Sequence, residues 1–167
     1  DLGVLLRTAG NLSASHYHFE QALKIWEKEG NIAGIASALN SIGVSHYMRG
    51  DYEKALDVYE IALQRAREAA SDRLCGFVLA GMGDTYLACG DIERAIQAYE
   101  QSQSFAQRIA DTYLAGYVLG ALSMAHLLRG ELTQALDLAR QAFERASEQG
   151  AKQEAATYQI VLGAVYY

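Results

Sequence analysis

The histidines are the side chains of this sequence best suited to acid–base or metal chemistry near neutral pH. His16 and His18 are two residues apart, which places them on nearly opposite faces of a helix and argues against a shared metal ion. His46 and His126 hold equivalent places in a forty-residue repeat described below, where other units have tyrosine. Because two repeats of stacked helices separate them, they cannot ligate one metal ion. The pattern predicts that His46 and His126 fill helix–hairpin cores.

The two cysteines, Cys75 and Cys89, are fourteen residues apart. On one helix this spacing separates them by roughly 21 Å. A disulfide needs Cα atoms within about 7 Å of one another. We therefore expect free thiols of the buried type, which is typical of proteins from a reducing compartment.

No motif of an enzyme or cofactor site is present. The stretch GMGDTY at residues 81–86 lacks the third glycine of a dinucleotide-binding loop and lies within a predicted helix rather than after a strand. Glu144 and Glu148 are four residues apart and predict a solvated helix face. Zinc-protease, paired-cysteine and phosphate-loop motifs are absent. We therefore expect a protein that is not an enzyme and that holds no cofactor or metal ion.

The elements that hold these residues form a tandem repeat. Residues 50–56 read GDYEKAL, residues 90–96 read GDIERAI and residues 130–136 read GELTQAL. Apolar residues recur three and four positions apart within each unit, which indicates two amphipathic helices. Glycine can end one helix in a left-handed turn, and Asp or Asn can cap the next. Hairpin joins are predicted near Gly10, Gly50, Gly90 and Gly130, and joins between hairpins at Gly30–Asn31, Ala70–Ser71, Ala110–Asp111 and Gly150–Ala151.

Small residues recur where the two helices of a hairpin are expected to cross. Gly43 and Ala55 face one another in the predicted register, and Tyr59 fills the space beside them. Gly83 takes the place of Gly43 in the next unit. A larger side chain there would overpack the crossing, at a cost of roughly 1–3 kcal/mol or more.

The pattern resembles the tetratricopeptide repeat family over the whole chain. The residues that carry the resemblance are Leu39, Ile42, Gly43, His46, Gly50, Asp51, Tyr52, Ala55, Tyr59, Ala62 and Leu63, then Leu79, Met82, Gly83, Tyr86, Gly90, Asp91, Ala95 and Tyr99. The forty-residue unit is similar to the long repeats of Leu-Gly-Asn repeat proteins and of bacterial regulators built around a signal-transducing NTPase. In the fourth unit, Ser123 and Ala139 depart from the glycine and the aromatic residue of the pattern. The resemblance implies an all-α fold, a right-handed superhelical solenoid of antiparallel helix hairpins.

Residues 1–167 are expected to form a single solenoid of about four units. Leu2–Gly3 matches Ile42–Gly43, and Tyr167 matches Tyr47, so we expect the chain to be cut within a unit at both ends. Exposed apolar ends could then pack head to tail between copies of the chain.

The charge pattern excludes several classes of partner. The chain has 14 Lys and Arg against 20 Asp and Glu, and it has no basic stripe that would bind a phosphate backbone. The stretch Thr112–Leu128 carries no formal charge, but Gly116, Gly120 and its register with the other units favour a buried helix over a membrane span. No signal-peptide pattern is visible. We expect a cytoplasmic protein that contacts neither nucleic acid nor membrane.

Stacked helix hairpins leave an extended concave surface, which in this family is lined by the first helix of each hairpin. Since each residue turns about 100° along a helix, the positions opposite the hairpin core can be identified. The residues predicted to line this partner-binding face are Ser37, Asn40, Ser41, Val44, Tyr47, Phe77, Asp84, Leu87, Tyr117, Met124 and Leu127. Asp84 and Asn40 are expected to supply the orienting polar contacts, while each aromatic residue has an alternative role in packing between repeats.

The apolar character of this face predicts a protein or peptide ligand, such as an amphipathic helix or an extended apolar segment. Family members that clamp the carboxylate end of a chaperone peptide present Lys, Arg and Asn here, and of these only Asn40 is found. The resemblance implies a non-catalytic protein–protein interaction module, the sensor or partner-docking arm of a larger bacterial transcription or signalling regulator. The alternative is a general assembly scaffold that joins proteins in a complex.

Overall fold

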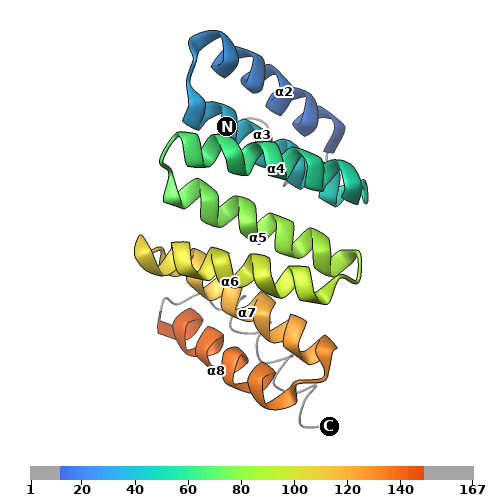
Figure 1. The fold of residues 1–167 in the computed structure, drawn as a ribbon, viewed down its shortest axis with the longest axis vertical. Coiled ribbons are helices and arrows are strands. Elements are labelled where there is room, and N and C mark those ends of the chain that lie inside the picture. Colours follow the sequence, from blue (N-terminus) through green and yellow to red (C-terminus); the bar gives the residue numbers. More distant parts are fainter. Residues whose placement is uncertain (1–11, 149–167) are drawn as a thin grey trace.

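The structure is a computed structural model that describes residues 12–148, which form seven α-helices joined by short turns (Figure 1). The helices are α2 (Leu12–Glu29), α3 (Ile32–Met48), α4 (Tyr52–Glu68), α5 (Asp72–Ala88), α6 (Ile92–Arg108), α7 (Thr112–Arg129) and α8 (Leu132–Glu148). No strand occurs in this part of the chain. The predicted all-α solenoid of antiparallel helix hairpins is confirmed. The joins predicted near Gly10 and Gly150, and both chain ends, lie outside the described residues.

Left-handed turns end the helices, as the sequence predicts. Gly50, Gly90 and Gly130 have φ angles of 79°, 80° and 84°, where glycine carries no steric penalty. Two joins between hairpins use the same conformation at Ala70 and Ala110, with φ angles of 49° and 52°. A left-handed conformation costs a residue with a Cβ about 1–2 kcal/mol. The two turns at Ala70 and Ala110, which join one hairpin to the next, are therefore locally strained.

Side chains cap four of the helix starts. In each case a side-chain oxygen accepts a hydrogen bond, of 2.9 to 3.4 Å, from the backbone N–H three residues on. These capping residues are Asn31, Ser71, Asp91 and Asp111. Asp51 was predicted to cap α4 in the same way, and this prediction was wrong. Its carboxylate lies 3.5 Å from His46 Nδ1 and 3.8 Å from Arg49 Nε, so nearby basic groups compete for it.

Tyrosine rings packed on glycines form the hairpin crossings. A Cβ at Gly43 would lie 2.6 Å from Cε1 of Tyr59, and a Cβ at Gly83 would clash with the ring of Tyr99 in the same way. Both tyrosines are only 1% exposed. Gly81 on α5 makes room for the other end of the Tyr59 ring, since a Cβ there would lie 2.7 Å from its hydroxyl oxygen. The predicted Gly–Tyr register is present, and Tyr59 also packs across two hairpins.

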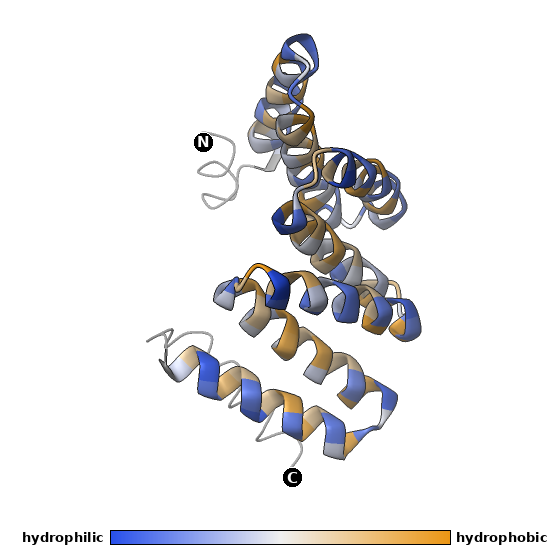
Figure 2. Cartoon of the chain, turned by 60° about the vertical axis from the view of Figure 1, so that its left-hand side comes forward, coloured by the Kyte–Doolittle hydropathy of each residue, from blue (hydrophilic) through white to orange (hydrophobic). Residues whose placement is uncertain are grey.

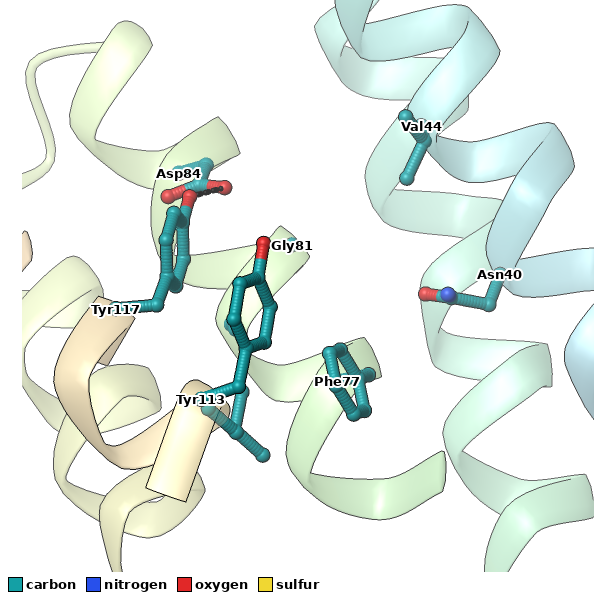
Figure 3. A pocket seen from close by; sticks show the side chains of 9 residues that line it. Asn40, Val44, Phe77, Gly81, Asp84, Tyr113 and Tyr117 are labelled. Carbon is teal, nitrogen blue, oxygen red and sulfur yellow. Dashed lines mark hydrogen bonds between the residues drawn. The ribbon is translucent and has the colours of Figure 1, made fainter. Parts of the chain in front are cut away.

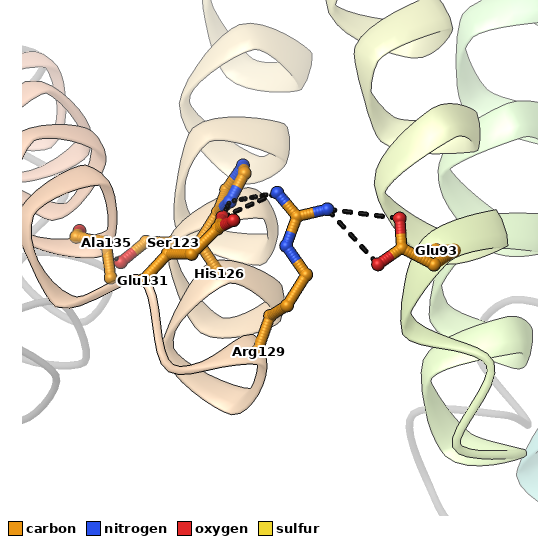
Figure 4. Close-up of polar contacts among 6 residues, drawn as sticks. All are labelled: Glu93, Ser123, His126, Arg129, Glu131 and Ala135. Atoms are coloured by element: carbon orange, nitrogen blue, oxygen red, sulfur yellow. Dashed lines mark hydrogen bonds and ion pairs between the residues drawn. The ribbon is translucent and has the colours of Figure 1, made fainter.

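The fourth hairpin replaces the Gly–Tyr pair by Ser123 and Ala139, both of which are buried. The Ser123 hydroxyl donates a 2.7 Å hydrogen bond to the backbone carbonyl of Ala135 on α8 (Figure 4). This departure from the repeat pattern therefore exchanges an aromatic packing contact for a buried hydrogen bond between the same two helices.

Arg129, the last residue of α7, joins two neighbouring hairpins (Figure 4). Its Nη2 donates to Oε2 of Glu131 at 2.5 Å, and its Nη1 donates to Oε2 of Glu93 on α6 at 3.1 Å. His126 is 2% exposed, and its Nδ1 lies 2.6 Å from the same Glu131 oxygen. His126 thus fills the hairpin core, as predicted, and a carboxylate holds its ring in place.

The described helices form two layers. In the inner layer α3 contacts α5 and α5 contacts α7, whereas the outer helices α2, α4, α6 and α8 do not contact one another. The stack therefore curves towards the inner layer. Hydrophilic residues recur at successive turns of the α8 helix, whereas the ribbon of α7 is mostly hydrophobic (Figure 2).

The uncharged stretch of the sequence lies in α7, which packs against α5, α6 and α8. Leu114 and Val118 on this helix are at most 1% exposed. Among the helices of residues 12–148, none has the length and apolar character that crossing a membrane requires.

Candidate functional site

A pocket opens in the inner layer between α3, α5 and α7 (Figure 3). Its volume is about 250 Å³. Its lining residues are Asn40, Val44, Phe77, Ala80, Gly81, Asp84, Tyr113, Leu114 and Tyr117. Because three successive hairpins each contribute one helix, the pocket exists only where the hairpins are stacked.

Asp84 is the acidic group of the pocket. Its Oδ1 accepts a 2.8 Å hydrogen bond from the hydroxyl of Tyr99 on α6, and its Oδ2 accepts a 2.6 Å bond from the hydroxyl of Tyr117 on α7. Burial raises the pKa of the Asp84 carboxyl, and the two hydroxyl hydrogen bonds oppose that rise. Burial and the nearby carboxylate raise the pKa of both tyrosines, which keeps them protonated as donors. No Lys, Arg or His of residues 12–148 forms an ion pair with Asp84.

Asn40 reaches the pocket from α3, on the opposite side from Asp84 and Tyr117 (Figure 3). Its Oδ1 is buried and has no hydrogen-bond partner in the described part of the chain. A buried acceptor without a donor is unfavourable by about 1–3 kcal/mol. The pocket therefore holds an unsatisfied amide oxygen on one wall and a carboxylate on the other.

Aromatic rings form the remaining walls. Tyr113 and Tyr117 are 62% and 40% exposed, which is unusual for large aromatic side chains. Phe77 lies between Tyr113 and Asn40 in the view of Figure 3. The guanidinium of Arg73 lies 4.8 Å from the Phe77 ring centroid and forms an ion pair with Asp111 at 3.4 Å. Neither Arg73 nor Asp111 lines the pocket.

The pocket brings together five of the residues predicted for the partner-binding face. These are Asn40, Val44, Phe77, Asp84 and Tyr117. The other six lie outside it, namely Ser37, Ser41, Tyr47, Leu87, Met124 and Leu127. Tyr47 packs on Tyr52 with ring centroids 5.9 Å apart, and Leu87 packs against the buried core.

Tyr113, Gly81 and Leu114 line the pocket but were not predicted. Tyr113 stands four residues before Tyr117 on one helix face, and this spacing of two aromatic residues is the signal that could have found it. Gly81 does not cradle a phosphate, because it lies in the middle of α5 against the Tyr59 ring. Leu114 has no signal beyond its apolar type.

The remaining candidate residues do not form a second site. The rings of His16 and His46 meet edge to face with centroids 4.9 Å apart, a pairing that the sequence did not reveal. Burial lowers the pKa of His16. Cys75 and Cys89 are free thiols, but only Cys75 is buried and Cys89 is exposed, contrary to the prediction. Among residues 12–148, no group of three His, Cys, Asp or Glu side chains could hold a metal ion.

Models of the tetratricopeptide repeat match the sequence at residues 1–29 and at residues 34–108. The chain belongs to the tetratricopeptide repeat family. Repeats of this family serve as scaffolds for protein–protein interaction. A comparison with curated proteins gives no significant match.

Several solved structures share the fold. The STAND protein (Signal Transduction ATPase with Numerous Domains) with a tetratricopeptide repeat sensor from Pyrococcus horikoshii aligns with 99% of the chain at a TM-score of 0.83 and 18% identity. BtubC (BKLC) from P. vanneervenii aligns with 93% at a TM-score of 0.78 and 17% identity. The TPR2AB domain of yeast Sti1, in a complex with pHSP90, aligns with 98% at 0.53 and 16% identity, and the alignment covers 86% of it. The chain spans 66% of the BtubC structure and 26% of the STAND protein.

Proposed function

We propose that this chain is a non-catalytic interaction module that binds a segment of a partner protein along its inner layer. The observation that carries the proposal is the pocket between α3, α5 and α7, where exposed tyrosines stand beside a carboxylate and an unpaired amide oxygen. Tyrosine is enriched at protein interfaces because it offers a large apolar surface and a polar tip. The proposed contact face continues from the pocket over Ser37, Ser41, Tyr47, Leu87, Met124 and Leu127.

We further propose that the module is the sensor or partner-docking arm of a larger bacterial transcription or signalling regulator. The similarity in fold to the repeat sensor of the STAND protein supports this role. The two free cysteines support a reducing, cytoplasmic location. An assembly scaffold is the second candidate, because repeats of this family serve as scaffolds for protein–protein interaction. A flanking NTPase core or DNA-binding helix-turn-helix in the full-length protein would favour the regulator.

The test compares two tyrosines of similar exposure on opposite layers. Tyr113 on α7 is 62% exposed in the pocket, and Tyr17 on the outer helix α2 is 57% exposed. The chain is immobilised, bound proteins are captured from a lysate of the source cells, and each is identified by mass spectrometry. We expect Tyr113→Ala to lose a specific partner that Tyr17→Ala retains. Equal capture by both variants would contradict binding at the inner layer.

A further inference from the structure

Two polar side chains on opposite walls of the inner-layer pocket have hydrogen-bond acceptors without a full set of donors. Asn40 presents the buried Oδ1, an acceptor, without a donor in the described part of the chain. Asp84 has two carboxylate oxygens with about four acceptor sites, and the hydroxyls of Tyr99 and Tyr117 occupy two of them. A ligand in the pocket would therefore satisfy the Asn40 amide oxygen and the Asp84 carboxylate only if it supplied hydrogen-bond donors.

The charge of Asp84 also lacks compensation. No Lys, Arg or His within residues 12–148 pairs with it, and its tyrosine partners are neutral. A buried carboxylate without a counter-ion is unfavourable, and a cation placed beside it relieves the cost. An anionic ligand would be repelled, and an apolar side chain would leave both acceptors unsatisfied. Complementarity therefore favours a cationic donor.

The aromatic walls distinguish between the cationic side chains. Tyr113 and Tyr117 offer ring surfaces on which a flat cation can stack, whereas the guanidinium of Arg73 already lies over the Phe77 ring. Guanidinium is planar, is more weakly hydrated than an ammonium group and carries five donors in a fork. The protein already uses this contact elsewhere, since the guanidinium of Arg108 lies 4.6 Å from the Phe105 ring centroid.

We propose that the inner-layer pocket binds an arginine side chain of the partner protein, with the guanidinium between the Asp84 carboxylate and the Asn40 amide oxygen and against the ring of Tyr113. This proposal rests on the proposed function, because it names the chemistry of the anchor that the partner segment inserts. The net charge of −6 favours the approach of such a basic segment.

The test uses small probes and the purified chain. Nα-acetyl-arginine amide, its neutral isostere Nα-acetyl-citrulline amide and Nα-acetyl-lysine amide are titrated at pH 8 while backbone amide NMR shifts are recorded. We expect the arginine probe to bind in the millimolar range, with the largest shifts around Asn40, Asp84 and Tyr113, and the other two to bind about tenfold more weakly or less. Shifts outside the pocket, or equal binding of citrulline amide or lysine amide, would overturn the assignment.

Matched variants separate the site from the fold. Asp84→Asn is expected to weaken arginine binding about tenfold or more, whereas Asp57→Asn, on the exposed outer surface of α4, should leave it unchanged. Asn40→Asp adds a second carboxylate and should tighten binding several-fold, a gain that misfolding cannot produce. Arginine affinity unchanged by both Asp84→Asn and Asn40→Asp would overturn the proposal. A failed titration together with partner loss in Tyr113→Ala would refute the arginine anchor and leave the proposed function standing.

Discussion

Substitution of Gly83 by alanine tests the packing on which the stack of hairpins depends. The added Cβ would lie 2.5 Å from Cδ1 and 2.9 Å from Cζ of the Tyr99 ring. That ring is 1% exposed, and its hydroxyl is held on Asp84 at 2.8 Å, so it cannot swing away without breaking a buried hydrogen bond. Overpacking of this kind costs about 1–3 kcal/mol.

The matched control is Gly116→Ala on α7, where an added Cβ would meet no atom of residues 12–148 outside its own helix within 4 Å. Both positions lie inside helices, so alanine gains about 0.5–1 kcal/mol of helix stability at each. The difference between the two variants therefore isolates the clash with Tyr99. We expect Gly83→Ala to be less stable than Gly116→Ala by about 1–3 kcal/mol, which lowers its Tm by about 2–4 °C per kcal/mol in a chain of this size.

The measurement is thermal and urea unfolding of both variants, with and without Tyr99→Ala. Removing the ring should abolish the penalty, so that Gly83→Ala becomes neutral or stabilising in that background. If Gly83→Ala and Gly116→Ala shifted stability equally, or if the penalty persisted without the ring, the Gly–Tyr packing described for α5 and α6 would be refuted.

Three further predictions follow from local features. Ala110→Gly should raise stability by about 0.5–1 kcal/mol in urea unfolding, because it relieves the left-handed conformation of that alanine at φ 52°; a loss would show that the turn is unstrained. Ser123→Ala should cost about 1 kcal/mol through loss of a buried 2.7 Å hydrogen bond to α8, and unchanged unfolding would contradict that bond. Because burial raises the pKa of Asp84, the folded chain holds the proton of this carboxyl more tightly than the unfolded chain does. The stability gained from this protonation is fully present below the pKa of the unfolded chain, about 3.9, and is lost as pH rises through the pKa of the folded chain. Asp84→Asn should therefore gain stability relative to the parent chain between acid and neutral pH, where Tyr99 and Tyr117 stay protonated, and a difference independent of pH would count against a raised pKa.

The repeat pattern alone was sufficient to predict the helices. Glycine at forty-residue intervals and apolar residues three and four apart are local signals, because a left-handed turn and an amphipathic face each depend on neighbouring residues. The packing of Tyr59 on Gly43 could also be predicted, since a small residue recurs opposite an aromatic one. Asp51 shows the limit of such signals, because the competition of His46 and Arg49 for its carboxylate depends on side-chain positions.

The candidate site was only partly predictable. Asn40 and Asp84 could be assigned to the inner face from the helical period, but their place in one pocket depends on how α3, α5 and α7 are stacked. The hydrogen bonds from Tyr99 and Tyr117 to Asp84 join three helices and have no sequence pattern of their own.

The sequence by itself determined the helices, their turns and the face that each presents, because these properties follow from short-range periodicity and from the conformational freedom of single residues. Only the tertiary structure decided which polar groups remain unsatisfied in the inner layer. The hydrogen-bond donors near Asn40 Oδ1 and the cations near the Asp84 carboxylate can come only from side chains of neighbouring hairpins, which the sequence does not place. Burial between these hairpins makes an unpaired polar group unfavourable, so a ligand that pairs with it gains binding free energy.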